Sequence, residues 1–483
     1  DLHLSLRGQR QMCIRDRYFV KGVVTSSKGS LAIVSFPGGD DYFLYVGDLI
    51  GNDEHSLKSI SIFKLNLIIP FLLVISFVYS SILGISILPD SKSYIEGYEI
   101  RTVGYPIIIH LFKKIFKENA LFYLVFFQIF LWLLSSLFFV KEISRVFNFS
   151  KRVTFVLLII MCLPLNPLDK FGNSVLTESF AFIGIIWFLI FIFRTFEKDN
   201  LKEFLILTLI LVFSQLIRPQ MLFLSFFLII ISFPLFLIKK KNQGIFFIIS
   251  AILGFFISSN IDKTYHYFKH DRFGTIPFTG IQIINLPLFT ISKENIGKIR
   301  NPSHKTDILL MKEKLIKNDP YSNQEIFEAS RSINNFAASY NTIISKAIYP
   351  TLEERYPKYK YNEIDKKLIE LTKEIVFVCL LNQPISLISA YVDNIVHLGF
   401  AGWIWFLLTI FILFLSLFYF IKFKTQRLFI ICSVCMAHFC NIILVSVLEP
   451  VIWRYSFYTE LPLTVMIITL LIFSFLHNFK KNL

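Results

Sequence analysis

Five ionisable side chains stand where apolar stretches of the chain meet polar loops. The carboxylate is Asp90, and the cations are Arg101, Lys170, Arg218 and Arg454. A charge at such a place is costly beside lipid and needs a polar cavity or a partner. A guanidinium fork fits phosphate oxygens, and a carboxylate can take a proton from an attacking hydroxyl. These residue types predict a site for a phosphate-bearing molecule, with Asp90 as the base.

Taken singly, each of these residues has a simpler interpretation. Asp90 could be a helix-end residue in the headgroup layer, and each cation could be a headgroup anchor. Four outward cations at four different helix ends favour a shared site instead. Glu96 and Glu99, a few residues further into the same loop, are the fallback candidates for the base.

The composition and the apolar stretches predict the elements that hold these residues. The chain has 483 residues, of which 54% are hydrophobic and 55 are Phe, whereas soluble domains are about 45–50% apolar. Lipid offers the backbone no hydrogen-bond partner, so apolar stretches of about 20 residues must be helices. We therefore expect an all-α polytopic membrane protein with about ten transmembrane helices. The expected spans are 65–88, 120–140, 153–168, 179–193, 204–217, 219–238, 244–261, 398–421, 428–448 and 461–476.

The distribution of Lys and Arg predicts which loops share a side. Five short loops, beginning at 141, 194, 239, 422 and 477, contain 15 of these cations, and the three short loops opposite contain one each. Cationic loops stay in the cytoplasm. Lys170, Arg218 and Arg454 are therefore expected to face outward. Strong overall basicity, with a net charge of +15, needs no nucleic-acid partner to explain it.

Segments outside the spans complete the expected organisation. Residues 57–261 form spans one to seven, with the first outer loop at 89–119, and residues 398–483 form spans eight to ten. Residues 262–397 are expected to form an exoplasmic loop domain that ends in an interfacial helix at 376–397. The stretch 107–120 is a second amphipathic interfacial helix.

The amino-terminal region differs from the rest. Residues 1–17 resemble translated read-through and are expected not to be native. Residues 18–56 are β-like, with alternating strands expected at 18–25, 31–36 and 42–46. Deleting residues 1–56 is expected to leave membrane insertion and activity intact, because the bundle starts near Leu57.

Four short motifs carry a resemblance to a known family. Asp90-Ser91-x-x-Tyr94 followed by Arg101-x-x-Gly104-Tyr105-Pro106 resembles the first exoplasmic loop of GT-C-type membrane glycosyltransferases, which include protein O-mannosyltransferases and aminoarabinose transferase. Leu176-Thr177-Glu178-Ser179 is similar to the start of their fourth helix. Arg218-Pro219-Gln220 is similar to their Arg-Pro turn, and Arg454-Tyr455 with Pro462 to their last outer loop. The resemblance spans about 60–480.

Membership of this family would imply a polyprenyl-phosphate sugar donor, a GT-C-like arrangement and inverting transfer on the outer face, without a nucleotide sugar. We expect no cofactor, and a metal is optional for this chemistry. Asp90 would be the base. Arg101, Lys170, Arg218 and Arg454 would bind phosphate, and Tyr94, Tyr105 and Glu178 would line the pocket. The acceptor would be a cell-envelope lipid, glycan or protein, as in lipopolysaccharide biosynthesis, on the periplasmic side of a bacterial inner membrane. Many relatives carry a second acidic residue beside the first, and here Glu96 and Glu99 are nearest.

Other functions remain open at this point. An O-antigen polymerase or ligase also has many spans and a large outer loop, but usually carries its key arginines within that loop. A lipid-linked glycan flippase or transporter is a rival from another class, although we find no inverted repeat of broken helices.

Metal and nucleotide sites are not expected. Cys432-x-x-Cys435, with His438 and Cys440, has ligand-like spacing but lies within an apolar helix. His266-x-x-x-His270-Asp271 would place two His on one helix face, which by itself is a weak signal for a metal. No Walker A or Rossmann glycine motif occurs.

Overall fold

The chain divides into two compact units, Asp1–Val74 and Ile75–Leu483, which are described separately. The computed structural model describes residues 19–26, 29–35, 41–45, 53–165, 171–277, 279–319, 333–397, 402–450 and 453–481. The expectation for residues 1–17 lies outside the described residues.

The first unit contains a three-stranded antiparallel sheet in the order β1-β2-β3. Its strands are β1 (Phe19–Ser26), β2 (Gly29–Ser35) and β3 (Asp41–Tyr45). The register pairs Val23 with Ala32, and a bulge follows Val20. The strand ends lie within two residues of those expected from the alternating pattern. The helix α2 (Asp53–Leu83) begins in this unit and ends in the second.

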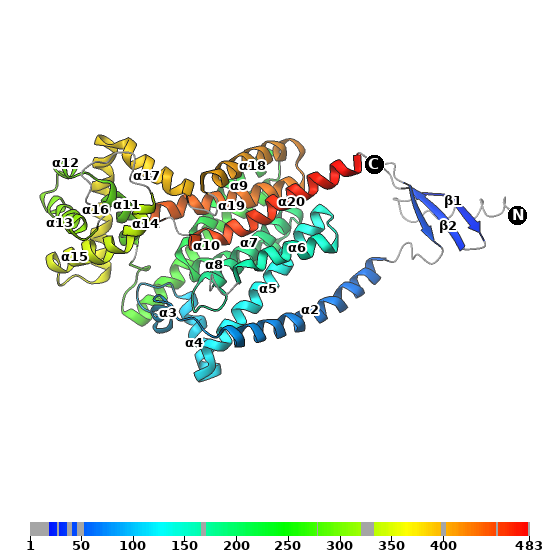
Figure 1. Cartoon of the computed structure of the whole chain (residues 1–483), viewed down its shortest axis with the longest axis horizontal. Coiled ribbons are helices and arrows are strands. Elements are labelled where there is room, and N and C mark those ends of the chain that lie inside the picture. Colours follow the sequence, from blue (N-terminus) through cyan, green and yellow to red (C-terminus); the bar gives the residue numbers. More distant parts are fainter. Residues whose placement is uncertain are drawn as a thin grey trace. The chain divides into compact units, whose positions relative to one another are not determined.

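The described remainder of the second unit is helical (Figure 1). Its α-helices are α3 (Ser91–Glu96), α4 (Gly104–Phe116), α5 (Ala120–Phe147), α6 (Lys151–Cys162), α7 (Glu178–Glu197), α8 (Leu201–Ile217), α9 (Phe223–Leu237), α10 (Lys241–His270), α11 (Thr279–Thr290), α12 (Lys293–Ile296), α13 (Pro302–Asn318), α14 (Ile333–Thr342), α15 (Tyr349–Arg355), α16 (Tyr361–Asn382), α17 (Pro384–His397), α18 (Gly402–Phe423), α19 (Gln426–Leu448) and α20 (Phe457–Lys481). Short 3₁₀ or π turns occupy Lys117–Asn119, Leu163–Leu165, Pro219–Leu222, Ile343–Ile348 and Trp453–Tyr455.

Seven helical segments of the described chain are long and apolar enough to cross a membrane, or up to eight if α16 and α17, bent by 114°, count as one broken span. The protein is therefore a polytopic helical membrane protein. Three expected spans are not among these segments. The span expected at 65–88 falls on α2, whose apolar part is Ile68–Leu83, and those expected at 153–168 and 204–217 fall on α6, with 12 residues, and α8, with 17. About 17 residues is the lower limit for a span, so the total of ten stays a prediction.

The segment between α4 and α5 reverses the chain. The Tyr105 hydroxyl donates to Gln128 Oε1 at 2.7 Å, and the rings of Phe116 and Tyr123 stack 4.4 Å apart. Residues so separated in sequence could not meet along one straight helix, which rises about 1.5 Å per residue. Lys117, with φ 50°, lies in the turn between the two helices. The α4 helix thus folds back on α5, at the position expected for an interfacial helix.

Of the hydrophobic cores in the described part of the second unit, the two largest are separate from each other. In the bundle, the Trp132 ring stacks on Phe182 at 4.0 Å and on Phe457 at 6.0 Å. The other core, which includes Ile284 and Leu371, joins helices α11 to α17, and we call this region (279–319 and 333–397) the helical lobe. The lobe begins later than the expected residue 262 because α10 continues as one helix to His270.

Helix ends gather at opposite ends of the bundle as the cation count predicts. At one end, Arg145 Nη2 lies 2.6 Å from Glu197 Oε2, and Gln426 donates to the same carboxylate at 3.1 Å. The other end brings together the loops at 90–101, 178, 218 and 454. The loops are therefore sorted as expected, while the face of the membrane to which each end belongs stays a prediction.

Candidate functional site

A short backbone pairing sets Asp90 beside the start of α7. After α2, Ser86 N–H donates to the Asn173 carbonyl at 2.9 Å, and Val175 N–H donates to the Ser86 carbonyl at 3.2 Å. Four residues further on, Asp90 precedes α3, and its side chain does not cap that helix. The carboxylate is therefore available to partners from elsewhere in the chain.

Alternating charges connect five distant positions into one arginine–carboxylate network. Arg101 Nη2 donates to Asp90 Oδ1 at 2.8 Å, and Arg454 Nη2 donates to Asp90 Oδ2 at 3.1 Å. Arg454 Nε also donates to Glu178 Oε1, and Arg218 Nη1 donates to the same oxygen at 3.0 Å. Three guanidinium groups thus share two carboxylates, which leaves an excess of positive charge.

The two carboxylates of the network differ in their solvent exposure. The Asp90 side chain is 40% exposed, whereas the Glu178 side chain is fully buried. Glu178 Oε2 has no hydrogen-bond partner in the described part of the chain. A buried oxygen without a donor is costly, so the two arginines at Oε1 must offset the burial of this carboxylate. Asp90 is the open carboxylate and Glu178 the anchor.

Tyrosine rings hold the arginines in place. The Arg101 guanidinium lies 4.4 Å from the centre of the Tyr94 ring, and its Nη1 donates to the Tyr94 hydroxyl at 3.1 Å. Tyr105 is fully buried behind Tyr94, with ring centres 5.4 Å apart. Of the two tyrosines expected to line the pocket, Tyr94 contacts the network directly and Tyr105 supports it.

The turn after α8 and the start of α20 supply a second layer of contacts. The Arg218 guanidinium lies 5.0 Å from the ring centre of Tyr455 and 5.7 Å from that of Tyr458. The Tyr458 hydroxyl donates to Gln220 Oε1 at 2.7 Å, and Gln220 Nε2 donates to Asn441 at 2.7 Å. These buried polar contacts fix Arg218, and the sequence analysis gave Tyr458 and Asn441 no role.

Glu449 is a further acidic residue that the sequence analysis missed. It follows α19 directly and accepts two hydrogen bonds from the helical lobe. Gln282 donates to Glu449 Oε1 at 2.7 Å, and Asn394 donates to the Glu449 carbonyl at 2.9 Å. Burial raises the pKa of the Glu449 carboxyl more than Tyr340, Arg218 and Gln282 lower it. Its place at the mouth of a span is the same signal that singled out Asp90.

The pKa of Asp90 is displaced in the opposite direction. Burial alone would raise it, but the charges of Arg101 and Arg454 and their hydrogen bonds hold the pKa below its usual value. The Arg454 pKa rises because the nearby Glu178 carboxylate outweighs desolvation. Asp90 is therefore ionised throughout the physiological range.

A close approach of two backbones fixes the distance between the halves of the site. A Cβ placed on Gly104 would lie 2.7 Å from the carbonyl carbon and oxygen of Leu216. Next to it, the Thr102 hydroxyl donates to the Ile217 carbonyl at 3.1 Å. Only a glycine lets the loop that carries Arg101 approach the end of α8, next to Arg218.

Lys170 and the two fallback bases complete the set of expected residues. Lys170 lies outside the described residues. Of the fallback bases, Glu96 is an exposed partner of Lys92 at 3.9 Å, and Glu99 Oε1 lies 2.9 Å from Arg272 Nε. The second carboxylate linked to Asp90 is thus Glu178, from another segment, rather than a neighbour in the first loop.

The potential metal ligands do not form a cluster. The His266 and His270 rings lie 5.4 Å apart, and Cys432 and Cys435 are buried within α19. No group of three or more His, Cys, Asp or Glu side chains among the described residues is placed to hold a metal ion.

Known proteins offer no guide to this site. No family model matches the sequence, and no curated protein and no solved structure matches it.

Proposed function

We propose that the protein is a GT-C-like membrane glycosyltransferase that moves a sugar from a polyprenyl-phosphate donor to a cell-envelope lipid, glycan or protein. The observation that supports this most strongly is the arginine–carboxylate network: a half-exposed carboxylate, Asp90, lies between two guanidinium groups at one end of a membrane bundle. A lipid-linked sugar phosphate presents its anomeric carbon and its phosphate together at that depth.

The residues divide the chemistry between them. Asp90 takes the proton of the acceptor hydroxyl, the freed oxygen forms the new bond to the anomeric carbon, and the bond from that carbon to the phosphate oxygen breaks. The phosphate leaves with the electron pair. Arg101 and Arg454 stabilise the charge that develops on it, with Arg218 beside Glu178 as the deeper cation.

Donor binding would also prepare the base. The donor phosphate competes with Asp90 for Arg101 and Arg454, because the same guanidinium groups serve both. When a guanidinium turns toward phosphate, it stabilises the Asp90 carboxylate less, and the pKa of Asp90 rises toward the range in which general bases are effective. Asp90 is thus a weak base in the empty site and a stronger one in the loaded site.

The orientation belongs to the same proposal. The network faces the periplasm of a bacterial inner membrane, and the helical lobe lies on that side. Reporter fusions after residue 300 should give exoplasmic signals, and fusions after residue 240 cytoplasmic ones. A cytoplasmic signal at residue 300 would overturn the scheme.

The central test replaces the base. Asp90→Asn should still bind a synthetic polyprenyl-phosphate sugar, and its turnover should fall by about 10²–10⁴-fold, the usual contribution of a general base. Glu96→Gln, in the same loop, should retain turnover. Equal turnover of Asp90→Asn and the parent protein would exclude Asp90 as the base, and a loss in Glu96→Gln alone would move that role to the fallback residue.

The acceptor can be sought in cells. Mass spectrometry of envelope lipids and glycans with and without the gene should reveal one species that lacks a sugar in the deletion strain. If the envelope instead accumulates an unflipped but complete lipid-linked glycan, the rival flippase function is correct.

A further inference from the structure

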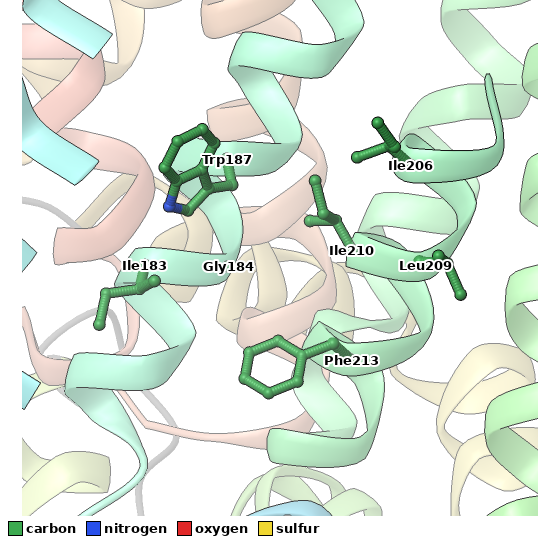
Figure 2. A pocket seen from close by; sticks show the side chains of 7 residues that line it. All are labelled: Ile183, Gly184, Trp187, Ile206, Leu209, Ile210 and Phe213. Carbon is green, nitrogen blue, oxygen red and sulfur yellow. The ribbon is translucent and has the colours of Figure 1, made fainter. Parts of the chain in front are cut away.

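Below the network, an apolar groove runs between α7 and α8. It has a cavity volume of about 220 Å³ and is lined by Ile183, Gly184, Trp187, Ile206, Leu209, Ile210 and Phe213. Figure 2 shows these side chains on the two neighbouring helices, with Ile183 and Trp187 on one and Ile210 and Phe213 on the other. The volume is smaller than the roughly 300–1,000 Å³ of a site for a whole small molecule, and it suits a section of a hydrocarbon chain.

The two helices that form the groove also carry the ion pair at the end of the network. Glu178 begins α7, and Arg218 follows α8 directly. Ile183 and Phe213 are each five residues from that pair, which is about 7 Å along a helix, and Ile206 is about 18 Å from it. The groove therefore extends into the membrane directly from the level of the Arg218–Glu178 pair.

A row of aromatic rings connects the groove to the network. The Tyr94 ring, beneath Arg101, lies 5.4 Å from Tyr105, which lies 5.8 Å from Phe180. Phe180 in turn lies 6.3 Å from Phe213, which lines the groove. Tyr105 and Phe180 are buried, so this row packs the protein between the network and the groove and fixes the position of one relative to the other.

Small residues open the groove at its base. A Cβ on Gly184 would lie 2.4 Å from Ser214 Oγ, so the glycine lets α7 and α8 approach closely beneath the cavity. Leu209, on the rim, is 67% exposed. A chain in the surrounding lipid can therefore reach the groove from the side without any movement of the helices.

We infer that the groove between α7 and α8 holds the first isoprenoid units of the lipid-linked phosphate, whose phosphate binds the arginines above. This assignment rests on the proposed function and adds to it how the site recognises the carrier. The groove makes the length of the lipid chain part of substrate recognition, because a chain too short to enter it loses these contacts while the phosphate keeps its own.

Binding of two phosphates that differ only in chain length tests the assignment. The purified protein, in detergent or nanodiscs, is titrated with a long polyprenyl phosphate and with a two-unit analogue. The wild-type protein should bind the long compound at least about tenfold more tightly. Leu209→Trp, which fills the groove from its exposed rim, should remove most of that difference and leave the affinity for the two-unit analogue unchanged. Leu205→Trp is the matched control, because Leu205 is an exposed leucine on α8 outside the groove, and it should change neither affinity.

The outcomes separate failure of the groove from failure of the proposed function. If the chain-length preference survives in Leu209→Trp, or is absent from the wild-type protein while both phosphates bind, the groove does not hold the carrier and the proposed function stands. If Leu209→Trp weakens an anionic phospholipid as much as the long polyprenyl phosphate, the groove is an ordinary lipid site. If the wild-type protein binds neither polyprenyl phosphate, the proposed function fails and the assignment falls with it.

Discussion

Two clusters in this protein are built from the same kinds of side chain and differ in what surrounds them. In the helical lobe, Asp307 accepts from Arg355 Nε at 3.0 Å and from the Tyr356 hydroxyl at 2.6 Å, and Lys367 lies 3.4 Å away. Asp90 likewise binds two cations. However, Asp307 is fully buried, and Asp90 is 40% exposed.

The origin of the partners differs as well. Those of Asp307 come from one region of the lobe, whereas the arginine–carboxylate network joins α3, α7 and the loops around 101, 218 and 454. An enclosed carboxylate whose partners all lie in one lobe stabilises that lobe. A half-exposed carboxylate whose partners link several elements of the bundle can exchange them for a ligand. The comparison indicates that exposure and the spread of partners over the fold, rather than residue type or sequence separation, distinguish a structural ion cluster from a candidate site.

The largest expected effect on stability is that of Asp307→Ala. The substitution leaves Lys367 and Arg355 without their buried partner, which costs about 3 kcal/mol or more. Thermal or denaturant unfolding of the purified protein measures the loss. Glu294→Ala, which removes an exposed partner of Lys298 in the same lobe, should cost less than about 1 kcal/mol. Asp90→Ala should lower the free energy of unfolding as little as this control does. If Asp90→Ala lowers it as much as Asp307→Ala, the two clusters do not differ in the way proposed here.

Next in size is the effect of Arg454→Ala on donor affinity. Arg454 touches both carboxylates, and loss of a charged hydrogen-bonding partner typically costs about 1.5–3 kcal/mol, or roughly 10–150-fold in affinity. Arg218→Ala should weaken the donor too. It should also lower stability, because Arg218 is buried against Glu178. Titration with polyprenyl phosphate and thermal unfolding separate the two effects. Full donor affinity in both variants would make these arginines lipid anchors.

A third expected effect concerns pH. The Asp90 pKa lies below its ordinary value, so Asp90 is ionised at neutral pH, and the proposed activity should fall only as pH drops through that lowered pKa. The Arg454→Gln variant lacks one of the two positive charges that lower the Asp90 pKa. The acidic limb of its pH profile of kcat/KM should therefore move to higher pH. Arg427→Gln, at the opposite end of the bundle near Val146, should leave the limb in place. If the acidic limb of the pH profile stays in place in Arg454→Gln, the activity does not depend on ionisation of Asp90.

The smallest expected effect tests whether the two regions act independently. Gln282→Ala removes one hydrogen bond from the lobe to Glu449, worth about 0.5–1.5 kcal/mol. Donor affinity should change by less than about tenfold. The matched change Asn301→Ala removes a helix cap on the outside of the lobe and should leave donor affinity unchanged. A much larger loss in Gln282→Ala would make the lobe part of the site.

Sequence reasoning could place the site at one end of the bundle because charge beside lipid is conspicuous. Asp90, Arg218 and Arg454 each stand alone at a helix mouth, and the distribution of cations sorts those mouths by side. The partners were not predictable, because the choice of Arg454 by both carboxylates depends on how α7 and α20 pack. Glu449 carried the same local signal as Asp90 and could have been found.

The fold was predictable where hydrophobic length alone decides it. Apolar runs located the helices, whereas α6 ends after 12 residues and so falls short of the expected span 153–168. Similarly, the expected interfacial helix at 376–397 is interrupted at Gln383, because Pro384 has no N–H to continue α16, and the chain bends by 114°. Such endings depend on packing partners that are distant in sequence.

The close contact between Gly104 and the Leu216 backbone has a consequence for how this site can vary. A methyl group there meets backbone atoms, which cannot rotate away as a side chain would. An alanine at residue 104 would therefore force apart the two chain segments that carry Arg101 and Arg218. The width of the network is therefore set by the side chain that residue 104 lacks. A larger residue at this one position would widen the network without altering any charged residue.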